Sequence, residues 1–153
     1  MITSKTLPVV AEIQLVYKPN TDIQNAPKVS SSRCAYQIFK EVWAEDTIEF
    51  YESFKIILLN SGNKVLGVVE ISRGGISGTV VDPKLVFAAA LKANSASIIL
   101  AHNHPSGNLR PSAQDEKLTR RLVEVGKLLD LPILDHIIVT SEGYYSFADE
   151  GNL

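Results

Sequence analysis

The sequence is poor in the residues that build disulfide scaffolds and membrane spans. It contains a single cysteine, Cys34, so neither an internal disulfide nor a cysteine-rich zinc cage is possible. The longest apolar runs, such as 56–59 and 98–101, are far too short to cross a bilayer, and the first residues show no signal-peptide pattern. We therefore expect a cytoplasmic protein that does not enter a membrane.

An excess of charge of one sign is also missing. Lys and Arg total 15, Asp and Glu total 17, and the net charge is −2 with neutral histidines. A chain without surplus positive charge has no global field to hold nucleic acid, so composition gives DNA association little support. The apolar content of 45% and the length of 153 residues are typical of one globular domain with a substantial core.

Strands and helices alternate along most of the chain. Apolar alternation and short apolar runs predict strands, and apolar spacing of three to four residues predicts helices. This order favours an α/β fold, a sandwich built on a single mixed sheet with flanking helices. Because 18–29 is rich in Pro and Asn, we divide the chain into an N-terminal strand and linker (1–29) and one domain (30–153). The predicted strands are 9–17, 53–60, 64–72, 96–101, 132–140 and 144–147, and the predicted helices run from a cap in 30–32 to about 44, from 83 to about 93, and over 112–129.

Two of the three histidines lie in one tripeptide where an apolar strand ends. His102 and His104 follow strand 96–101 and share a face, because side chains two residues apart in a strand point the same way. Asp115 lies on the same helical stripe as Leu118, so its carboxylate is expected to point inward, which is costly without a cation. Two imidazoles and one carboxylate form a ligand set common in catalytic zinc sites. The sequence therefore predicts Zn²⁺ bound by these three side chains.

The spacing of Ser112 and Asp115 has a second interpretation. Ser-x-x-Asp at the start of a helix resembles a capping box, in which the serine caps and the acidic residue returns a hydrogen bond. The two roles are compatible, since Ser112 can cap the helix while Asp115 binds a metal. Histidines in a loop are commonly ordinary hydrogen-bonded groups, and it is their conjunction with Asp115 that favours metal binding.

These residues also carry a resemblance. The spacing His-x-His, seven residues, Ser-x-x-Asp resembles the signature of the JAMM/MPN (JAB-type) metalloprotease superfamily, and HNHPSG (102–107) with LLDLPILDHIIVT (128–140) resembles its bacterial RadC branch. The resemblance extends from about residue 52 to 147 and implies a JAMM/MPN fold of cytidine-deaminase-like architecture. It implies zinc ligands at His102, His104 and Asp115, and a serine at Ser112 that supports the oxyanion. RadC proteins also carry an N-terminal helix-hairpin-helix region, for which we expect no room here.

The resemblance further implies an upstream catalytic glutamate. Glu52 matches it, because Glu52-Ser53-Phe54 heads a strand that is followed by a turn and a second strand. Glu70, a carboxylate inside the apolar run VVEI, is the rival; we favour Glu52 because a base needs geometric reach first. Asp135 and His136 fall in an apolar strand, where a structural histidine is the main interpretation and orientation of a neighbouring ligand the alternative.

The expected function is cleavage of a peptide or isopeptide bond in a protein or peptide substrate by zinc-activated water. A catalytically silent zinc-binding interaction module is one alternative, and an accessory protein of DNA repair or of mobile elements is another. A deaminase is excluded, because its signature needs His-x-Glu and Cys-x-x-Cys. The letters HNH do not indicate an HNH nuclease, because no further histidine-based metal finger follows.

Overall fold

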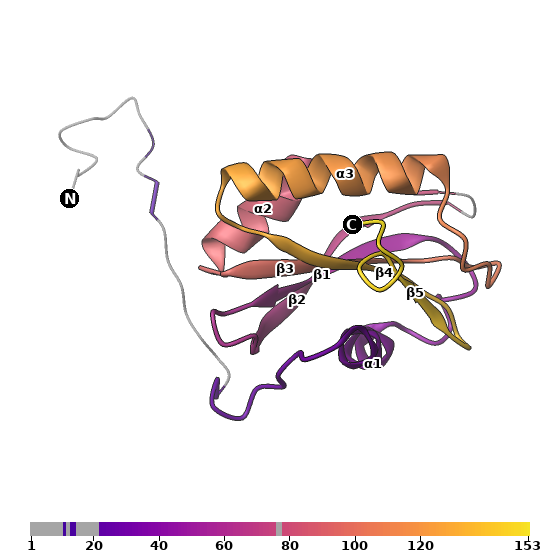
Figure 1. Cartoon of the computed structure of the whole chain (residues 1–153), viewed down its shortest axis with the longest axis horizontal. Coiled ribbons are helices and arrows are strands. Elements are labelled where there is room, and N and C mark those ends of the chain that lie inside the picture. Colours follow the sequence, from indigo (N-terminus) through magenta and orange to yellow (C-terminus); the bar gives the residue numbers. More distant parts are fainter. Residues whose placement is uncertain (1–10, 12, 15–21, 76–77) are drawn as a thin grey trace.

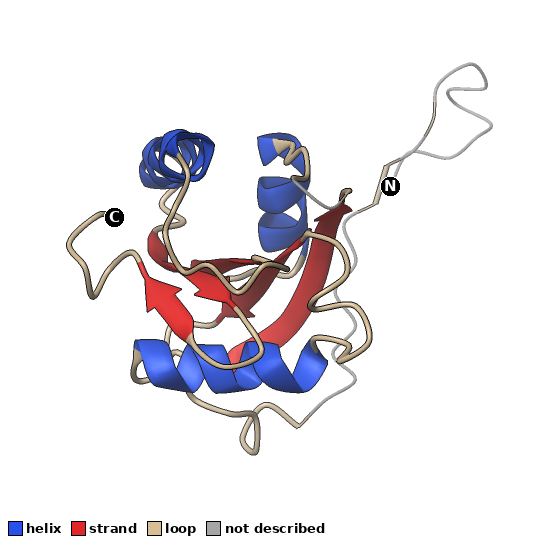
Figure 2. Cartoon of the chain, turned by 90° about the vertical axis from the view of Figure 1, so that its right-hand side faces the viewer, coloured by secondary structure: helices blue, strands red, loops and turns tan. Residues whose placement is uncertain are grey.

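The protein has three layers, with one sheet between two layers of helices (Figures 1 and 2). This computed structural model describes residues 11, 13–14, 22–75 and 78–153. Helix α1 (Ser32–Val42) covers one face of the sheet, and helices α2 (Pro83–Lys92) and α3 (Ala113–Leu128) cover the other. The predicted α/β fold with a single mixed sheet is confirmed.

The sheet has five strands in the order β2-β1-β3-β4-β5. Strands β1 and β2 form an antiparallel hairpin, β1 and β3 are antiparallel, β3 and β4 are parallel, and β4 and β5 are antiparallel. Helix α3 makes the crossover between the parallel pair, as such a connection requires. The strand bounds are β1 Ser53–Leu59, β2 Val65–Arg73, β3 Ser97–Asn103, β4 Ile133–Val139 and β5 Tyr144–Ser146.

The central strands are buried on both faces, so they appear in the sequence as apolar runs rather than as alternation. Alternate residues contribute to two separate cores. Ile57, Ile99 and Ile137 pack with Phe39 and other residues of α1 on one face. On the other face, Phe54, Ile56, Leu58, Ile98 and Leu100 pack with residues of α2 and α3 that include Val86, Phe87, Ala90 and Leu122.

Each helix begins at a side-chain cap. The hydroxyl of Ser31 accepts a hydrogen bond from the Cys34 N–H at the start of α1. At the start of α2, the carboxylate of Asp82 accepts one from the Lys84 N–H, and Pro83 occupies the first helical position. Ser112 caps α3. The caps explain why the predicted helix starts lie close to the observed ones. Among the helices of the described ranges, none combines the length and apolar character needed to span a bilayer.

Two predicted elements need comment. Strand β3 continues to Asn103, two residues past its expected end, because β1 and β4 pair with it on both sides; His102 therefore lies inside the strand rather than beyond it. The expected strand 9–17 falls mostly outside the described residues, which include only 11, 13 and 14 of that range. Val29, assigned to the linker, is buried in the core beneath α1, and its N–H donates to the Asn63 carbonyl.

Candidate metal centre

The two histidines are delivered by the central strand β3. His102 pairs with Phe54 of β1 and Ile138 of β4, and its side chain lies on the sheet face that α2 and α3 cover. The chain continues in register for one further residue, where the N–H of His104 donates to the Val139 carbonyl at 3.2 Å. His102 thus lies within the central strand, and His104 directly follows it.

A tight turn then redirects the chain into α3. Gly107 adopts φ 81°, a left-handed conformation that glycine tolerates without strain, and its N–H donates to the His104 carbonyl at 3.0 Å. Nδ1 of His104 lies 2.6 Å from the Asn108 carbonyl oxygen. A carbonyl only accepts, so Nδ1 carries the proton and Nε2 keeps its lone pair directed at Asp115.

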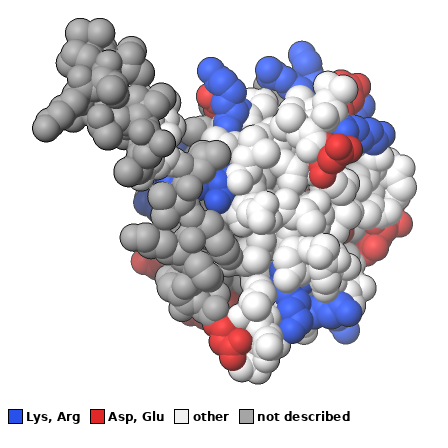
Figure 3. Space-filling view, turned by 90° about the vertical axis from the view of Figure 1, so that its left-hand side faces the viewer, with Lys and Arg blue, Asp and Glu red and all other residues white. Residues whose placement is uncertain are grey.

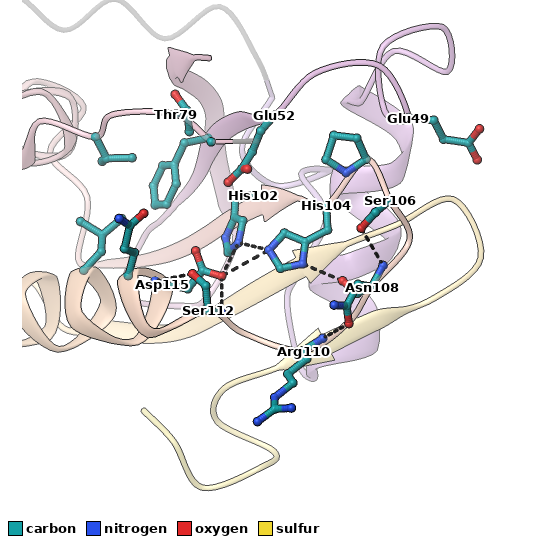
Figure 4. A pocket seen from close by; sticks show the side chains of 16 residues that line it. Glu49, Glu52, Thr79, His102, His104, Ser106, Asn108, Arg110, Ser112 and Asp115 are labelled. Carbon is teal, nitrogen blue, oxygen red and sulfur yellow. Dashed lines mark hydrogen bonds and ion pairs between the residues drawn. The ribbon is translucent and has the colours of Figure 1, made fainter. Parts of the chain in front are cut away.

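Asp115 forms the capping box and also lies against both imidazoles. Its N–H donates to the Ser112 hydroxyl at 3.0 Å, and its Oδ2 accepts the Ser112 N–H at 2.8 Å, which completes a capping box. The same Oδ2 lies 3.3 Å from Nε2 of His102 and 3.2 Å from Nε2 of His104. The cap therefore holds the carboxylate in place against the two imidazoles (Figure 4).

The three atoms form a nearly regular triangle, whose third side, between the Nε2 atoms of His102 and His104, is 2.9 Å. Ligands about 2.0–2.1 Å from a tetrahedral zinc ion lie about 3.3 Å from one another. The spacing and the chemistry of this donor set, two imidazole nitrogens and one carboxylate oxygen, fit a zinc ion. His102, His104 and Asp115 are the residues that would hold it.

The groups around Asp115 keep its carboxylate ionised. Burial acts to raise the pKa of Asp115, but its close contacts with His102 and His104 and the hydrogen bond from the Ser112 N–H outweigh it and hold the pKa well below its usual range. Burial acts to lower the pKa of His104, yet its contacts with Asp115 and the Asn108 carbonyl raise it overall. A carboxylate that stays ionised is suited to bind a cation.

Glu52 approaches the same point from the neighbouring strand. It immediately precedes β1, and the ladder continues past the strand end through the bonds from Glu52 N–H to the Gly75 carbonyl and from Gly74 N–H to the Glu52 carbonyl. One atom each from Glu52, His102, His104 and Asp115 lies within 4.8 Å of all the others. Figure 4 shows the Glu52 carboxylate directed toward His102. Burial raises the pKa of Glu52, and the neighbouring imidazoles of His102 and His104 partly oppose this rise.

Glu70 does not join this cluster. Its carboxylate forms ion pairs with Lys55 at 3.4 Å and with Arg73 at 3.0 Å. Burial acts to raise the pKa of Glu70, but the hydrogen bond from Arg73 and the charge of Lys55 lower it overall. The acid inside the apolar run VVEI is thus explained by two neighbouring cations.

Sequence reasoning did not single out Asn103, which lies between the two histidines and points to the opposite face of the sheet. Its amide oxygen accepts the Ser53 N–H at 2.8 Å, and its amide nitrogen donates to the Ile48 and Tyr51 carbonyls at 2.7 and 2.9 Å. These bonds fix the segment that carries Glu52. A fully buried asparagine needs hydrogen-bond partners for its side-chain amide. An asparagine inside an apolar strand was therefore the feature of the sequence that could have pointed to Asn103.

His136 is fully buried behind the cluster. Its Nε2 lies 2.8 Å from Nδ1 of His102, and its Nδ1 lies 2.6 Å from the hydroxyl of Thr119, a residue that sequence reasoning also did not single out. Burial, together with the neighbouring imidazole of His102, lowers the pKa of His136 well below its usual value. Asp135 points elsewhere and accepts hydrogen bonds from Ser146 and the Ala148 N–H.

The cluster opens into a cleft of about 630 Å³, a size typical of ligand sites. Apolar side chains of Phe54, Val81 and Leu118 line part of it, and Ser106 and Arg110 contribute polar groups. Gly78 and Thr79 also line the cleft, whereas Gly74 and Gly75 extend the ladder with Glu52.

Comparison with known proteins identifies the family of this chain. A family model described as a RadC-like JAB domain matches residues 29–152. A UPF0758 protein of Flavobacterium johnsoniae is 40% identical over 149 residues, which cover 97% of this chain and 64% of the relative. A UPF0758 protein of Porphyromonas gingivalis is 36% identical over 152 residues (98% and 66%), and one of Alkaliphilus metalliredigens is 46% identical over 99 residues (65% and 43%).

The chain belongs to the RadC-like JAB domain family. Its five-stranded mixed sheet and three helices are consistent with a JAB/MPN-type fold. It spans no more than about two thirds of the length of these relatives.

Proposed function

We propose that this domain is a zinc-dependent hydrolase that cleaves a peptide or isopeptide bond. One observation carries the proposal: three ligand atoms of His102, His104 and Asp115 converge beside the Glu52 carboxylate at an open cleft. Zinc bound by three protein ligands activates water near neutral pH and polarises a carbonyl, which is the chemistry amide hydrolysis needs. Membership of the JAB family supports the same reaction class.

Glu52 has the position of the general acid and base. One Glu52 carboxylate oxygen lies within 4.8 Å of each ligand atom, and Glu52 lines the same cleft, so a water molecule at the cluster would be within its reach. A carboxylate there takes the proton of the attacking water and later gives it to the departing amine nitrogen. Burial raises the pKa of Glu52, which brings it closer to the pKa of the attacking water that would give it a proton.

Ser112 is placed to stabilise the developing oxyanion. Its Oγ accepts the Asp115 N–H, so the hydroxyl proton remains available for donation into the cleft that Ser112 lines. Removing one such donor typically costs about 10²–10³ in turnover. The hydroxyl would therefore serve the helix cap and the reaction at once.

A peptide chain is the partner we propose. Figure 3 shows the side of the molecule away from the start of α3, where Lys and Arg mix with Asp and Glu around a largely uncharged centre, so the described surface visible there has no single sign of charge. The net charge of −2 likewise gives no support to tight DNA binding. An extended polypeptide needs no such field.

Glu52→Gln separates hydrolysis from metal binding. We expect the variant to bind zinc with unchanged stoichiometry and to lose turnover of peptide and isopeptide libraries by about 10²–10⁴-fold, because the proton acceptor is gone. Glu70→Gln is the matched control and should retain turnover, since Glu70 pairs with Lys55 and Arg73 and lies outside the cluster. Chelation should abolish cleavage by the wild-type protein. Full turnover of Glu52→Gln, or cleavage insensitive to chelator, would contradict the mechanism; bound zinc without any cleavage would favour the silent module.

A further inference from the structure

A chain of buried hydrogen bonds runs behind the metal centre, from helix α3 through β4 to β3. The Thr119 hydroxyl lies 2.7 Å from the Asp115 carbonyl oxygen and 2.6 Å from Nδ1 of His136. Nε2 of His136 lies 2.8 Å from Nδ1 of His102. All three side chains are at most 2% exposed, so water does not compete for these bonds.

The Asp115 carbonyl can only accept, and this determines which atom donates in each of the other hydrogen bonds of the chain. The Asp115 carbonyl has no proton to give, so the single proton of the Thr119 hydroxyl must point to it. The Thr119 oxygen can then only accept from His136, which places a proton on Nδ1 of His136. A neutral imidazole has one N–H, so Nε2 of His136 is an acceptor.

This assignment determines the tautomer of His102, one of the proposed metal ligands. Because Nε2 of His136 accepts, Nδ1 of His102 must donate, and Nε2 of His102 is left with its lone pair. That lone pair faces Oδ2 of Asp115, where a cation fits. The opposite tautomer of His102 would place a proton on Nε2, in the position that the metal needs.

Aromatic packing keeps the His136 ring from rotating out of this chain. The Phe147 ring stacks on it with centroids 4.8 Å apart and an interplanar angle of 12°, and Phe54 contacts it edge-on at 5.6 Å. Phe54 also lies parallel to the His102 ring at 6.3 Å. The two imidazoles are therefore held in mutual orientation by packing as well as by hydrogen bonds.

We propose that Thr119 and His136 are positioning residues that set the metal-binding tautomer of His102 before the ion arrives. The inference rests on the metal centre proposed above. The chain of hydrogen bonds starts at the backbone carbonyl of Asp115 and ends at His102, so it connects two of the three proposed ligands. Partners of this kind typically contribute 10–100-fold to metal affinity.

The test replaces the Thr119 hydroxyl without changing side-chain volume. Thr119→Val removes both of its hydrogen bonds, Thr119→Ser restores them, and Thr140→Val is the matched control, because the Thr140 hydroxyl is also buried but bonds Gly143. Long-range ¹H–¹⁵N NMR of the metal-free proteins reports the His102 tautomer. Competition with a chromophoric chelator gives the zinc Kd.

We expect the Nδ1–H tautomer of His102 in the metal-free wild type, in Thr119→Ser and in Thr140→Val. In Thr119→Val the tautomer should shift toward Nε2–H, and zinc binding should weaken by about 10–100-fold. Nε2–H at His102 in the wild type, or no greater loss of affinity in Thr119→Val than in Thr140→Val, would overturn the inference. A wild-type protein with the expected tautomer that binds no zinc would overturn the metal centre itself, which distinguishes the two failures.

Discussion

At the residue scale, a single carboxylate oxygen links folding to the site. Oδ2 of Asp115 accepts the N–H of the helix cap Ser112 and faces Nε2 of both His102 and His104. Because the cap already positions this oxygen, little side-chain freedom remains to be lost when a cation binds. The capping box and the proposed ligand set share this oxygen.

Substitutions at Ser112 can separate the cap from the hydroxyl donor. Ser112→Ala should lower the free energy of unfolding by about 1 kcal/mol and turnover by about 10²–10³-fold, because both functions are lost. Ser112→Thr should keep both. Ser112→Gly should cost only a few tenths of a kcal/mol, since glycine is tolerated as a cap, yet lose the same turnover. Urea unfolding and peptide cleavage would measure the two effects; full turnover in Ser112→Gly would exclude the oxyanion role.

The residue scale also shows what the sequence could supply. His102, His104 and Asp115 could be singled out because their types and spacing are local features of one turn and one helix start. Glu52 and Glu70 could be ranked but not separated, because only the structure shows that Lys55 and Arg73 neutralise Glu70. The partners of His136 depend on packing between α3 and β4, which no local pattern encodes.

At the element scale, α3 is anchored at both ends. Its first turn holds Asp115, and near its end Gly126 approaches the backbone that leads into β4. The Leu131 N–H donates to the Gly126 carbonyl at 2.8 Å, and a Cβ on Gly126 would lie only 2.4 Å from the Leu131 carbonyl oxygen. This close approach sets the distance between α3 and the strand that carries His136.

Gly126→Ala should therefore destabilise the protein, although alanine is the better helix former by about 1 kcal/mol. The added methyl group must displace backbone, and overpacking of this kind typically costs about 1–3 kcal/mol. We expect a net decrease of about 1–2 kcal/mol in the free energy of unfolding, measured with urea. Gly67→Ala is the control, because nothing lies within 4 Å of its added Cβ, and it should change stability by less than about 0.5 kcal/mol. A Gly126→Ala protein as stable as the wild type would refute the close-packing argument.

Element positions followed from caps and apolar runs, whereas element lengths did not. Ser31, Asp82 and Ser112 cap their helices within or next to the predicted starts. The two extra residues of β3 depend on pairing with β1 and β4, which lie far apart in the sequence. Strand ends in the centre of a sheet are set by their neighbours, so single-sequence patterns place them less well.

At the scale of the whole molecule, residues on both faces of the sheet contribute to the site. Asn103 points toward the α1 side and fixes the segment before β1, while His102 and His104 serve the α2 and α3 side. Glu52 and the ligands thus meet at one end of the sheet because β1 and β3 are adjacent and antiparallel. The site is a property of the assembled fold rather than of any one segment.

The central claim is that one zinc ion binds where these strands and α3 meet. The most direct test is an anomalous difference map from crystals grown with zinc, recorded on both sides of the zinc absorption edge. The account predicts one peak about 2.0–2.2 Å from Nε2 of His102, Nε2 of His104 and an oxygen of Asp115. A map in which zinc is bound elsewhere, or in which these three side chains contact no common ion, would contradict it.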